Sequence, residues 1–172
     1  LQEHLTGIRN IAIGGYSMGD TNSGTTAQDS DDNIFIGHVA GGGAWANVKS
    51  ELNVAIGNYS MDAALNGALY NVAIGHSAMG GVTSADSNIA IGYNAMLVHT
   101  TGAENIAIGK GAMDDNDAGS TSLSSNANTF IGVDAGGGTW ADAASNQNVA
   151  IGNYAMDAAM HGALNNTAVG YS

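Results

Sequence analysis

Two short stretches, 95 residues apart, place oxygen-bearing side chains where they could bind calcium. Each stretch alternates such side chains and ends in a glycine, which is the arrangement in the first half of a calcium-binding loop. The third acid and the closing bidentate glutamate of such a loop are missing, so a polar turn built from Asp, Asn and Gly is the competing interpretation. The candidate ligands are Asp20 and Asn22 in the first stretch and Asp115 and Asp117 in the second.

Two tryptophans stand at equivalent places in the phrase Gly-Gly-Gly-x-Trp-Ala, which covers 41–46 and 136–141. An indole ring beside flexible glycines could stack on a sugar ring, and it could equally pack within the fold or against a neighbouring chain. Trp45 and Trp140 are therefore candidate ligand contacts, with packing as the alternative.

The histidines do not form a catalytic set. A catalytic histidine needs an acid or a nucleophile at a matching position, and the five histidines fall at unrelated places in the sequence. The stretch 56–61 fits the hexapeptide phrase of left-handed-helix acyltransferases, but those enzymes repeat the phrase three times in each coil, and here it appears once. No Ser/His/Asp set, phosphate loop or zinc spacing occurs. We expect no enzyme, and solvated loop positions for His4, His38, His76, His99 and His161.

Composition excludes further classes of function. Fifteen Asp and Glu against three Lys and Arg give a formal net charge of -12, so the chain has no basic surface for nucleic acid. It contains no cysteine, and therefore no disulfide or thiolate metal site. No run of eighteen apolar residues occurs, so we expect no insertion of this segment into a membrane.

The elements that must position these residues follow from one five-residue phrase that recurs nine times. Asn opens each copy and Gly closes it, with Ile, Val or Thr in second place and Ile or Val in fourth. The third residue is Ala except at Phe35 and Phe130. The asparagines are Asn10, Asn33, Asn53, Asn71, Asn88, Asn105, Asn128, Asn148 and Asn166, and the glycines are Gly14, Gly37, Gly57, Gly75, Gly92, Gly109, Gly132, Gly152 and Gly170.

The spacing of the phrase reveals a longer period. Successive asparagines are 23, 20, 18, 17, 17, 23, 20 and 18 residues apart, so the series restarts after five units and 95 residues. Residues 53–77 and 148–172 accordingly match at 18 of 25 positions. We interpret 1–172 as a single repetitive segment with one cassette at 10–104 and a partial second cassette at 105–172. It starts and stops in mid-pattern, which indicates a piece of a longer repetitive protein.

Each phrase alternates a β-branched, a small and a β-branched residue, which predicts a short strand. The glycine supplies a corner with positive φ. A unit of 17–23 residues fits one turn of a β-solenoid, in which equivalent residues stack at about 4.8 Å. We therefore predict an all-β fold, a parallel β-solenoid of about nine short coils. The asparagines should form a ladder that passes amide hydrogen bonds from coil to coil.

The interior is expected to be thin. We expect the Ile and Val columns to form it, together with a methionine that follows the strand in six units. The two units with Phe35 and Phe130 carry Gly41 and Gly136 in place of this methionine, a pairing that constant volume in a close-packed interior would produce. The methionines are Met18, Met61, Met79, Met96, Met113 and Met156.

The phrase Asn-Val-Ala-Ile-Gly followed by x-x-Ser at 53–60 resembles the head repeat of trimeric autotransporter adhesins, a left-handed parallel β-roll. The looser copy at 166–172 is similar to repeats of bacteriophage tail fibres and other large bacterial surface proteins. The resemblance covers essentially the whole chain and implies a left-handed fold, a fibrous homotrimer, an extracellular, cell-surface or virion location, and attachment. The units are longer than usual in adhesin heads, which favours the phage-fibre or giant-surface-fibre version.

So thin a core should gain stability from a partner chain, and the small residues suit close approach. Three chains, each with a net charge of -12, would carry a charge of -36. Divalent ions or high salt would relieve the resulting repulsion, and calcium is the only cofactor we consider.

Tyrosines just after the glycine corner are expected at the surface or between chains. They are Tyr16, Tyr59, Tyr93 and Tyr154.

We therefore expect a structural and adhesive fibre segment that spaces or presents attachment sites for a receptor on a host or neighbouring cell, with glycans as candidate receptors. The alternative is the repeat unit of a self-assembling extracellular matrix filament. An ice-binding solenoid needs arrays of Thr in register, whereas Thr here is scattered over loops, so that function ranks below both.

Overall fold

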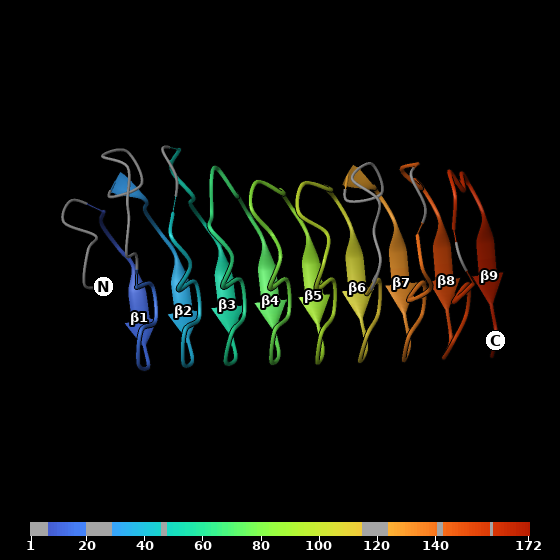
Figure 1. Cartoon of the computed structure of the whole chain (residues 1–172), viewed down its shortest axis with the longest axis horizontal. Coiled ribbons are helices and arrows are strands. Elements are labelled where there is room, and N and C mark those ends of the chain that lie inside the picture. The colour runs from blue at the N-terminus through green and yellow to red at the C-terminus, as the bar shows by residue number, and fades with distance from the viewer. Residues whose placement is uncertain (1–6, 20–28, 46–47, 115–123, 141–142, 159) are drawn as a thin grey trace.

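The computed structural model describes residues 7–19, 29–45, 48–114, 124–140, 143–158 and 160–172. The chain is all-β, and its nine strands form one parallel sheet in sequence order (Figure 1). The strands are β1 (Ile11–Ile13), β2 (Ile34–Ile36), β3 (Val54–Ile56), β4 (Val72–Ile74), β5 (Ile89–Ile91), β6 (Ile106–Ile108), β7 (Thr129–Ile131), β8 (Val149–Ile151) and β9 (Thr167–Val169).

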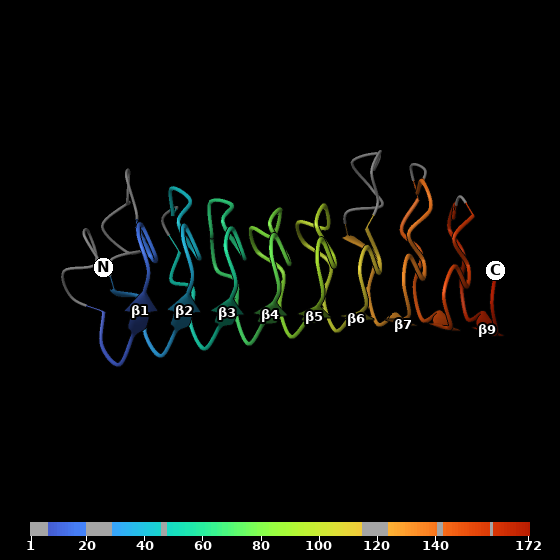
Figure 2. The ribbon, with the colours of Figure 1, turned by 90° about the horizontal axis from the view of Figure 1, so that it is seen from below.

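The predicted β-solenoid is confirmed, with about seven turns. This is fewer than the nine coils expected from the motif count, in part because only two residues follow the last copy, which cannot close a turn. Figure 2, turned by 90°, shows successive turns following one another along a single long axis.

Equivalent positions of the motif lie opposite one another at every step of the sheet. Ala73 pairs with Ala90, for example, and the same register holds from β1 to β9. The backbone N–H of Ile89 donates to the carbonyl of Asn105 at 2.8 Å, and the corresponding bond recurs between the other neighbouring units. The motif therefore sets both the strand and its register.

The position of the core corrects the sequence prediction. The middle residue of seven of the nine strands, Ala or Phe, is fully buried, whereas the flanking Ile and Val residues are not. Side chains in a strand alternate between two faces, so a three-residue strand turns one side chain inward and two outward. The expectation that the Ile and Val columns form the core was wrong, and those columns lie on the outer face of the sheet.

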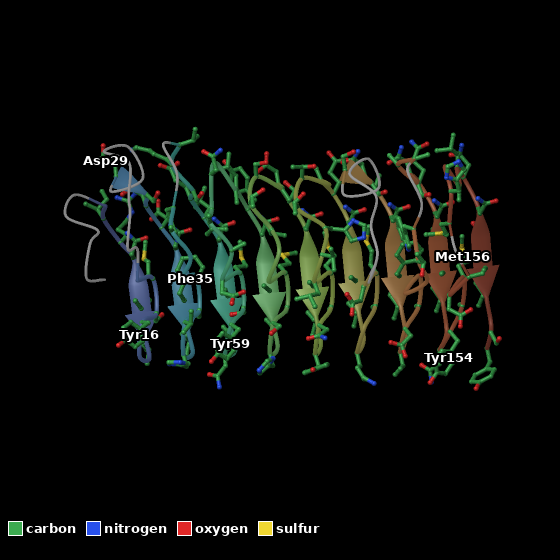
Figure 3. All side chains as sticks on the ribbon, viewed as in Figure 1. Tyr16, Asp29, Phe35, Tyr59, Tyr154 and Met156 are labelled. Carbon is green, nitrogen blue, oxygen red and sulfur yellow. The ribbon has the colours of Figure 1, made fainter. Side chains whose placement is uncertain are left out.

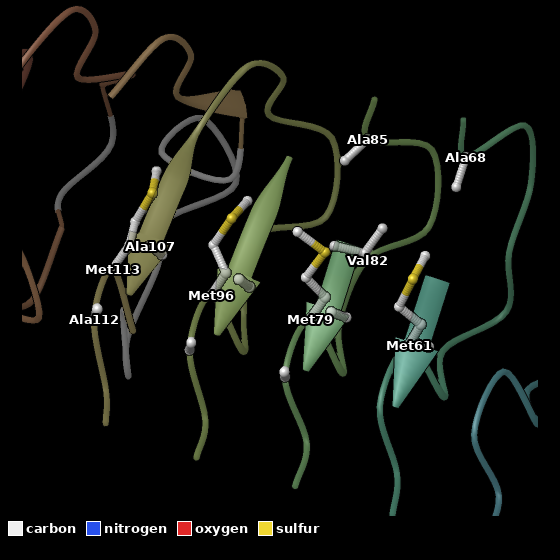
Figure 4. Close-up of a cluster of buried hydrophobic side chains, with 14 of the residues drawn as sticks. Met61, Ala68, Met79, Val82, Ala85, Met96, Ala107, Ala112 and Met113 are labelled. Atoms are coloured by element: carbon white, nitrogen blue, oxygen red, sulfur yellow. The ribbon is translucent and has the colours of Figure 1, made fainter. Parts of the chain in front are cut away.

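A row of methionines packs behind the middle residues of the strands. Figure 4 shows Met61, Met79, Met96 and Met113 at equivalent places in successive turns. All four, and Met18, are fully buried. Further buried side chains, three or four residues after the methionine or the glycine in its place, complete the core, and we call them the inner row. They are Trp45, Leu65, Val82, His99, Trp140 and Met160.

Glycine is required at the corner that ends each strand. The nine corner glycines have φ between 126° and 146°, a region that is essentially restricted to glycine. At Gly75, an added Cβ would overlap the carbonyl group of Gly92 in the next unit. The other corners that are followed by a further unit show the same close approach of two backbones. The conformation of glycine and its lack of a side chain are therefore both needed.

Candidate functional site

The predicted asparagine ladder is confirmed and runs through all nine units. The Oδ1 of Asn88 accepts hydrogen bonds from the backbone N–H and the Nδ2 of Asn105, at 2.9 and 3.1 Å. Its own Nδ2 donates to the Oδ1 of Asn71 at 3.1 Å and to the carbonyl of Gly102 at 2.8 Å. Equivalent bonds link each asparagine to the next along the solenoid, from the pair Asn10 and Asn33 at one end to the pair Asn148 and Asn166 at the other.

Each amide in the interior of the ladder has its donors and its acceptor satisfied. Seven of the nine asparagines are fully buried, so without these bonds each would carry a large desolvation penalty. The ladder therefore holds successive turns in register. Its buried interior offers no free polar group to a ligand, so the role of the interior is structural.

The tryptophans do not form a ligand surface. Trp45 and Trp140 are 1% and 0% exposed, and each indole Nε1 donates to a backbone carbonyl four residues earlier, at 2.9 Å. Each ring packs edge-on against the phenylalanine of its own unit, with centroids 5.8 Å apart. The packing alternative is therefore the observed one.

The calcium candidates Asp20, Asn22, Asp115 and Asp117 lie outside the described residues. Within the described part of the chain, no group of three or more His, Asp or Glu side chains could hold a metal ion.

One of the five histidines contradicts the expectation of solvated loop positions. His38, His76 and His161 are exposed, as expected, and His4 lies outside the described residues. His99 is fully buried in the inner row, where its ring lies edge-on to Trp140 with centroids 5.0 Å apart. Neither ring nitrogen has a hydrogen-bond partner within the described structure, and burial lowers the pKa of His99 to about 4.

The first surface feature is the outer face of the sheet, which we call the Ile/Val face. It consists of the first and third residues of every strand, and none of these eighteen side chains is buried. Sixteen of them are Ile or Val, two are Thr, and none is charged. Ile74 and Ile91, neighbours in one column, are each 37% exposed.

Sequence analysis missed this surface although a signal for it was present. The middle position of the strand is almost always Ala, the smallest side chain that can fill a narrow interior. Inward alanines leave the larger β-branched residues facing outward. A contiguous apolar surface of this kind on a single chain marks an interaction site.

A second surface feature is a row of rings at the turn that follows the strand, which we call the Tyr–His ladder. It consists of Tyr16, His38, Tyr59, His76 and Tyr93, one from each of five successive units. Neighbouring ring centroids are 6.0, 5.5, 5.5 and 5.5 Å apart. In Figure 3, Tyr16, Tyr59 and Tyr154 all lie beyond the carboxyl ends of the strands, on the opposite side from Asp29.

A group of charged residues lies at the other end of the first strands. Arg9 forms a two-pronged ion pair with Asp32 at 2.5 and 2.7 Å, and this hydrogen-bonded pairing lowers the pKa of Asp32. Lys49 lies 3.6 Å from Glu51 and 4.0 Å from Asp31. Two of the three cationic side chains of the protein are therefore paired on this side.

The chain gives no match to any protein-family model, curated protein or solved structure with which it was compared. No helix that could cross a bilayer occurs among the described residues. The assignment of a function therefore depends on the surfaces described above and on the motif.

Proposed function

We propose that this chain is a structural and adhesive segment of a surface fibre, either on a bacterial cell or on a virion. Three copies associate side by side in this fibre, and each buries its Ile/Val face against the others. The fibre spaces or presents attachment sites for a receptor on a host or neighbouring cell. The single observation that carries the proposal is the uninterrupted Ile/Val face.

The Ile/Val face suits lateral association for three reasons. Sixteen of its eighteen side chains are Ile or Val and none is charged, so burial removes apolar surface from water without desolvating an ion. Its β-branched side chains have few rotamers to lose on burial. Its two columns keep one register along the whole sheet, so equivalent chains can contact each other continuously.

Three copies around a common axis would close this surface. A cyclic assembly hides the same patch of every subunit and leaves no apolar face for further growth. The motif resembles adhesin-head and tail-fibre repeats. This resemblance supports three as the number of chains, a left-handed coil and an extracellular or virion setting. The charge of -12 on each chain opposes association, so the assembly should be strengthened by salt.

Sedimentation equilibrium tests the proposal. The wild-type chain of 17.1 kDa should sediment at three times this mass. The double variant Ile74→Lys/Ile91→Lys, which places charges in adjacent strands of the face, should sediment as a single chain. Asn66→Lys is the matched control, because Asn66 is exposed and lies outside the face. A single-chain mass for the wild type would contradict the proposal.

A matrix filament is the second candidate, and the 95-residue period favours it, because such a cassette could serve as the repeat of an extracellular fibre. A mass that rises without limit as the protein concentration is increased would support the filament over the discrete trimer.

A further inference from the structure

The Tyr–His ladder is a built surface, because its rings hold one another in place. Each ring contacts the ring of the neighbouring unit, and the contacts range from edge-on between Tyr16 and His38 to stacked between His76 and Tyr93. The hydroxyl of Ser77 lies 2.9 Å from Nδ1 of His76 and fixes this imidazole further. The rings therefore lose little conformational entropy when a ligand binds.

The ladder is also open to solvent. Tyr16 is 70% exposed, Tyr93 is 52% exposed and Tyr59 is 38% exposed, and both histidines are exposed as well. Neighbouring ring centroids from His38 to Tyr93 are 5.5 Å apart, so the rings form a continuous row across successive units. The C–H faces of pyranose rings pack on aromatic rings, and the phenol oxygen provides a polar group beside this contact.

Polar groups border the middle of the ladder. Asp62 stands three residues after Tyr59 and carries a partly exposed carboxyl, which could accept hydrogen bonds from sugar hydroxyls. Asn58 is exposed, and its Oδ1 accepts from the backbone N–H of His38 at 2.9 Å. Its amide nitrogen can then donate outward. Aromatic faces flanked by acceptors and donors match the chemistry of a carbohydrate.

The charge of the protein selects between classes of carbohydrate. A chain with a net charge of -12 repels anionic polymers. Arg9 and Lys49 are engaged with carboxylates at the opposite end of the strands. This leaves the exposed Lys110, in the unit after Tyr93, as the one cation near the ladder. An uncharged polysaccharide is not repelled by this net charge and needs no cationic partner.

We propose that the Tyr–His ladder binds an extended neutral polysaccharide laid along the solenoid axis. This inference rests on the proposed adhesive function and assigns it a ligand class and a site. The 95-residue period repeats part of the ladder, since Tyr154 and Tyr171 stand 95 residues after Tyr59 and His76, and their rings are 5.6 Å apart. Further cassettes would lengthen the site.

Affinity electrophoresis in native gels tests the proposal, with hydroxyethylcellulose and galactomannan as neutral probes and carboxymethylcellulose as the anionic probe. The wild type should be retarded in at least one neutral gel and not in the anionic gel. Tyr59→Ala/Tyr93→Ala should weaken the retardation at least about tenfold, because two stacking contacts are lost, whereas Tyr59→Phe/Tyr93→Phe should retain most of it.

Tyr70→Ala is the matched control, since Tyr70 is 59% exposed and lies outside the ladder. Equal losses for Tyr70→Ala and the double alanine variant would overturn the proposal, as would the absence of retardation of the wild type in both neutral gels. Sedimentation of the same samples separates this site from fibre assembly. A single-chain mass with intact retardation would support the ladder as a binding site and contradict the trimer.

Discussion

The ring of Phe35 occupies the space into which a side chain at position 41 would project. A Cβ built on Gly41 would lie 2.8 Å from Cδ1 of this ring, and Gly136 and Phe130 show the same relationship. Six other units carry a methionine at this position and an alanine in the strand, and five of these methionines, such as Met61, are fully buried. The predicted exchange of Ala plus Met for Phe plus Gly is therefore confirmed as an exchange of volume within a close-packed interior.

This relationship predicts a rescue by double mutation. Gly41→Met alone should destabilise the fold because the new side chain overlaps Phe35, and Phe35→Ala alone should cost about 3–5 kcal/mol through the cavity it leaves. The double variant Phe35→Ala/Gly41→Met reproduces the other units, so its loss should be smaller than the sum of the single losses by at least about 2 kcal/mol. Urea unfolding of the four proteins measures this coupling, and simple additivity would contradict the volume exchange.

The asparagine ladder predicts an unusually costly substitution. Asn88→Ala removes the acceptor for the backbone N–H and the Nδ2 of Asn105 and the donor for the carbonyl of Gly102. Three buried polar groups lose a partner at about 1–3 kcal/mol each, so the free energy of unfolding should fall by at least about 3 kcal/mol. Asn66→Ala, at an exposed position, should change it by less than about 0.5 kcal/mol. Similar values for the two variants in urea unfolding would show that the ladder adds no stability.

The corner glycines predict strict intolerance of a methyl group. Gly75 has φ +136°, and a Cβ there would overlap the carbonyl group of Gly92. Gly75→Ala should lower the free energy of unfolding by at least about 3 kcal/mol, from backbone strain and overlap together. At Gly15 the nearest atom to an added Cβ is Nδ1 of the exposed His38, at 3.3 Å. Gly15→Ala should be mild by comparison, and an equal loss of melting temperature at both positions would contradict the stacking of corners.

The buried His99 predicts a loss of stability in acid. Its pKa is about 4 in the folded chain and about 6.5 when unfolded. Above pH 6.5 the ring is neutral in both states. As the pH falls from about 6.5 to about 4 only the unfolded state gains the proton, so stability should decrease by about 3 kcal/mol. Other groups also titrate in this range, so the quantity to measure is the difference between wild type and His99→Leu.

In His99→Leu this component should vanish, since leucine fills the position without a titratable group. Neutral-pH stability of the variant should be equal or higher, because two buried nitrogens without partners in the described structure are removed. Urea unfolding of both proteins between pH 4 and pH 7.5 provides the comparison. If the free energy of unfolding of the two proteins depended on pH in the same way, His99 would be exposed to solvent and not buried in the core.

Strand positions, register and the asparagine column could be predicted because a short motif with a regular recurrence determines them locally. Alternation alone does not give the sidedness of the strand, because it separates Ala12 from Ile11 and Ile13 without saying which face is inward. The recurrent small residue in the middle position was the signal that could have given it. His99 was misplaced because its buried position lies in an inner row whose members, such as Leu65 and Val82, share no motif and follow the methionine at different distances.

The Tyr–His ladder escaped prediction for a related reason. His38 follows its corner glycine directly, whereas Tyr59 is the second residue after its own glycine. Alignment of the units by the motif therefore places the two rings in separate columns. Only the three-dimensional turn brings them within 5.5 Å of each other.

Cross-linking of a single introduced cysteine tests most directly the claim that chains associate through the Ile/Val face. The protein has no cysteine of its own, so Ile91→Cys and, as a control, Asn66→Cys each carry one thiol. Under mild oxidation Ile91→Cys should form covalent dimers rapidly and at low protein concentration, and Asn66→Cys should remain monomeric on a denaturing gel. Absence of dimers from Ile91→Cys, or equal yields from the two variants, would contradict burial of this face between chains.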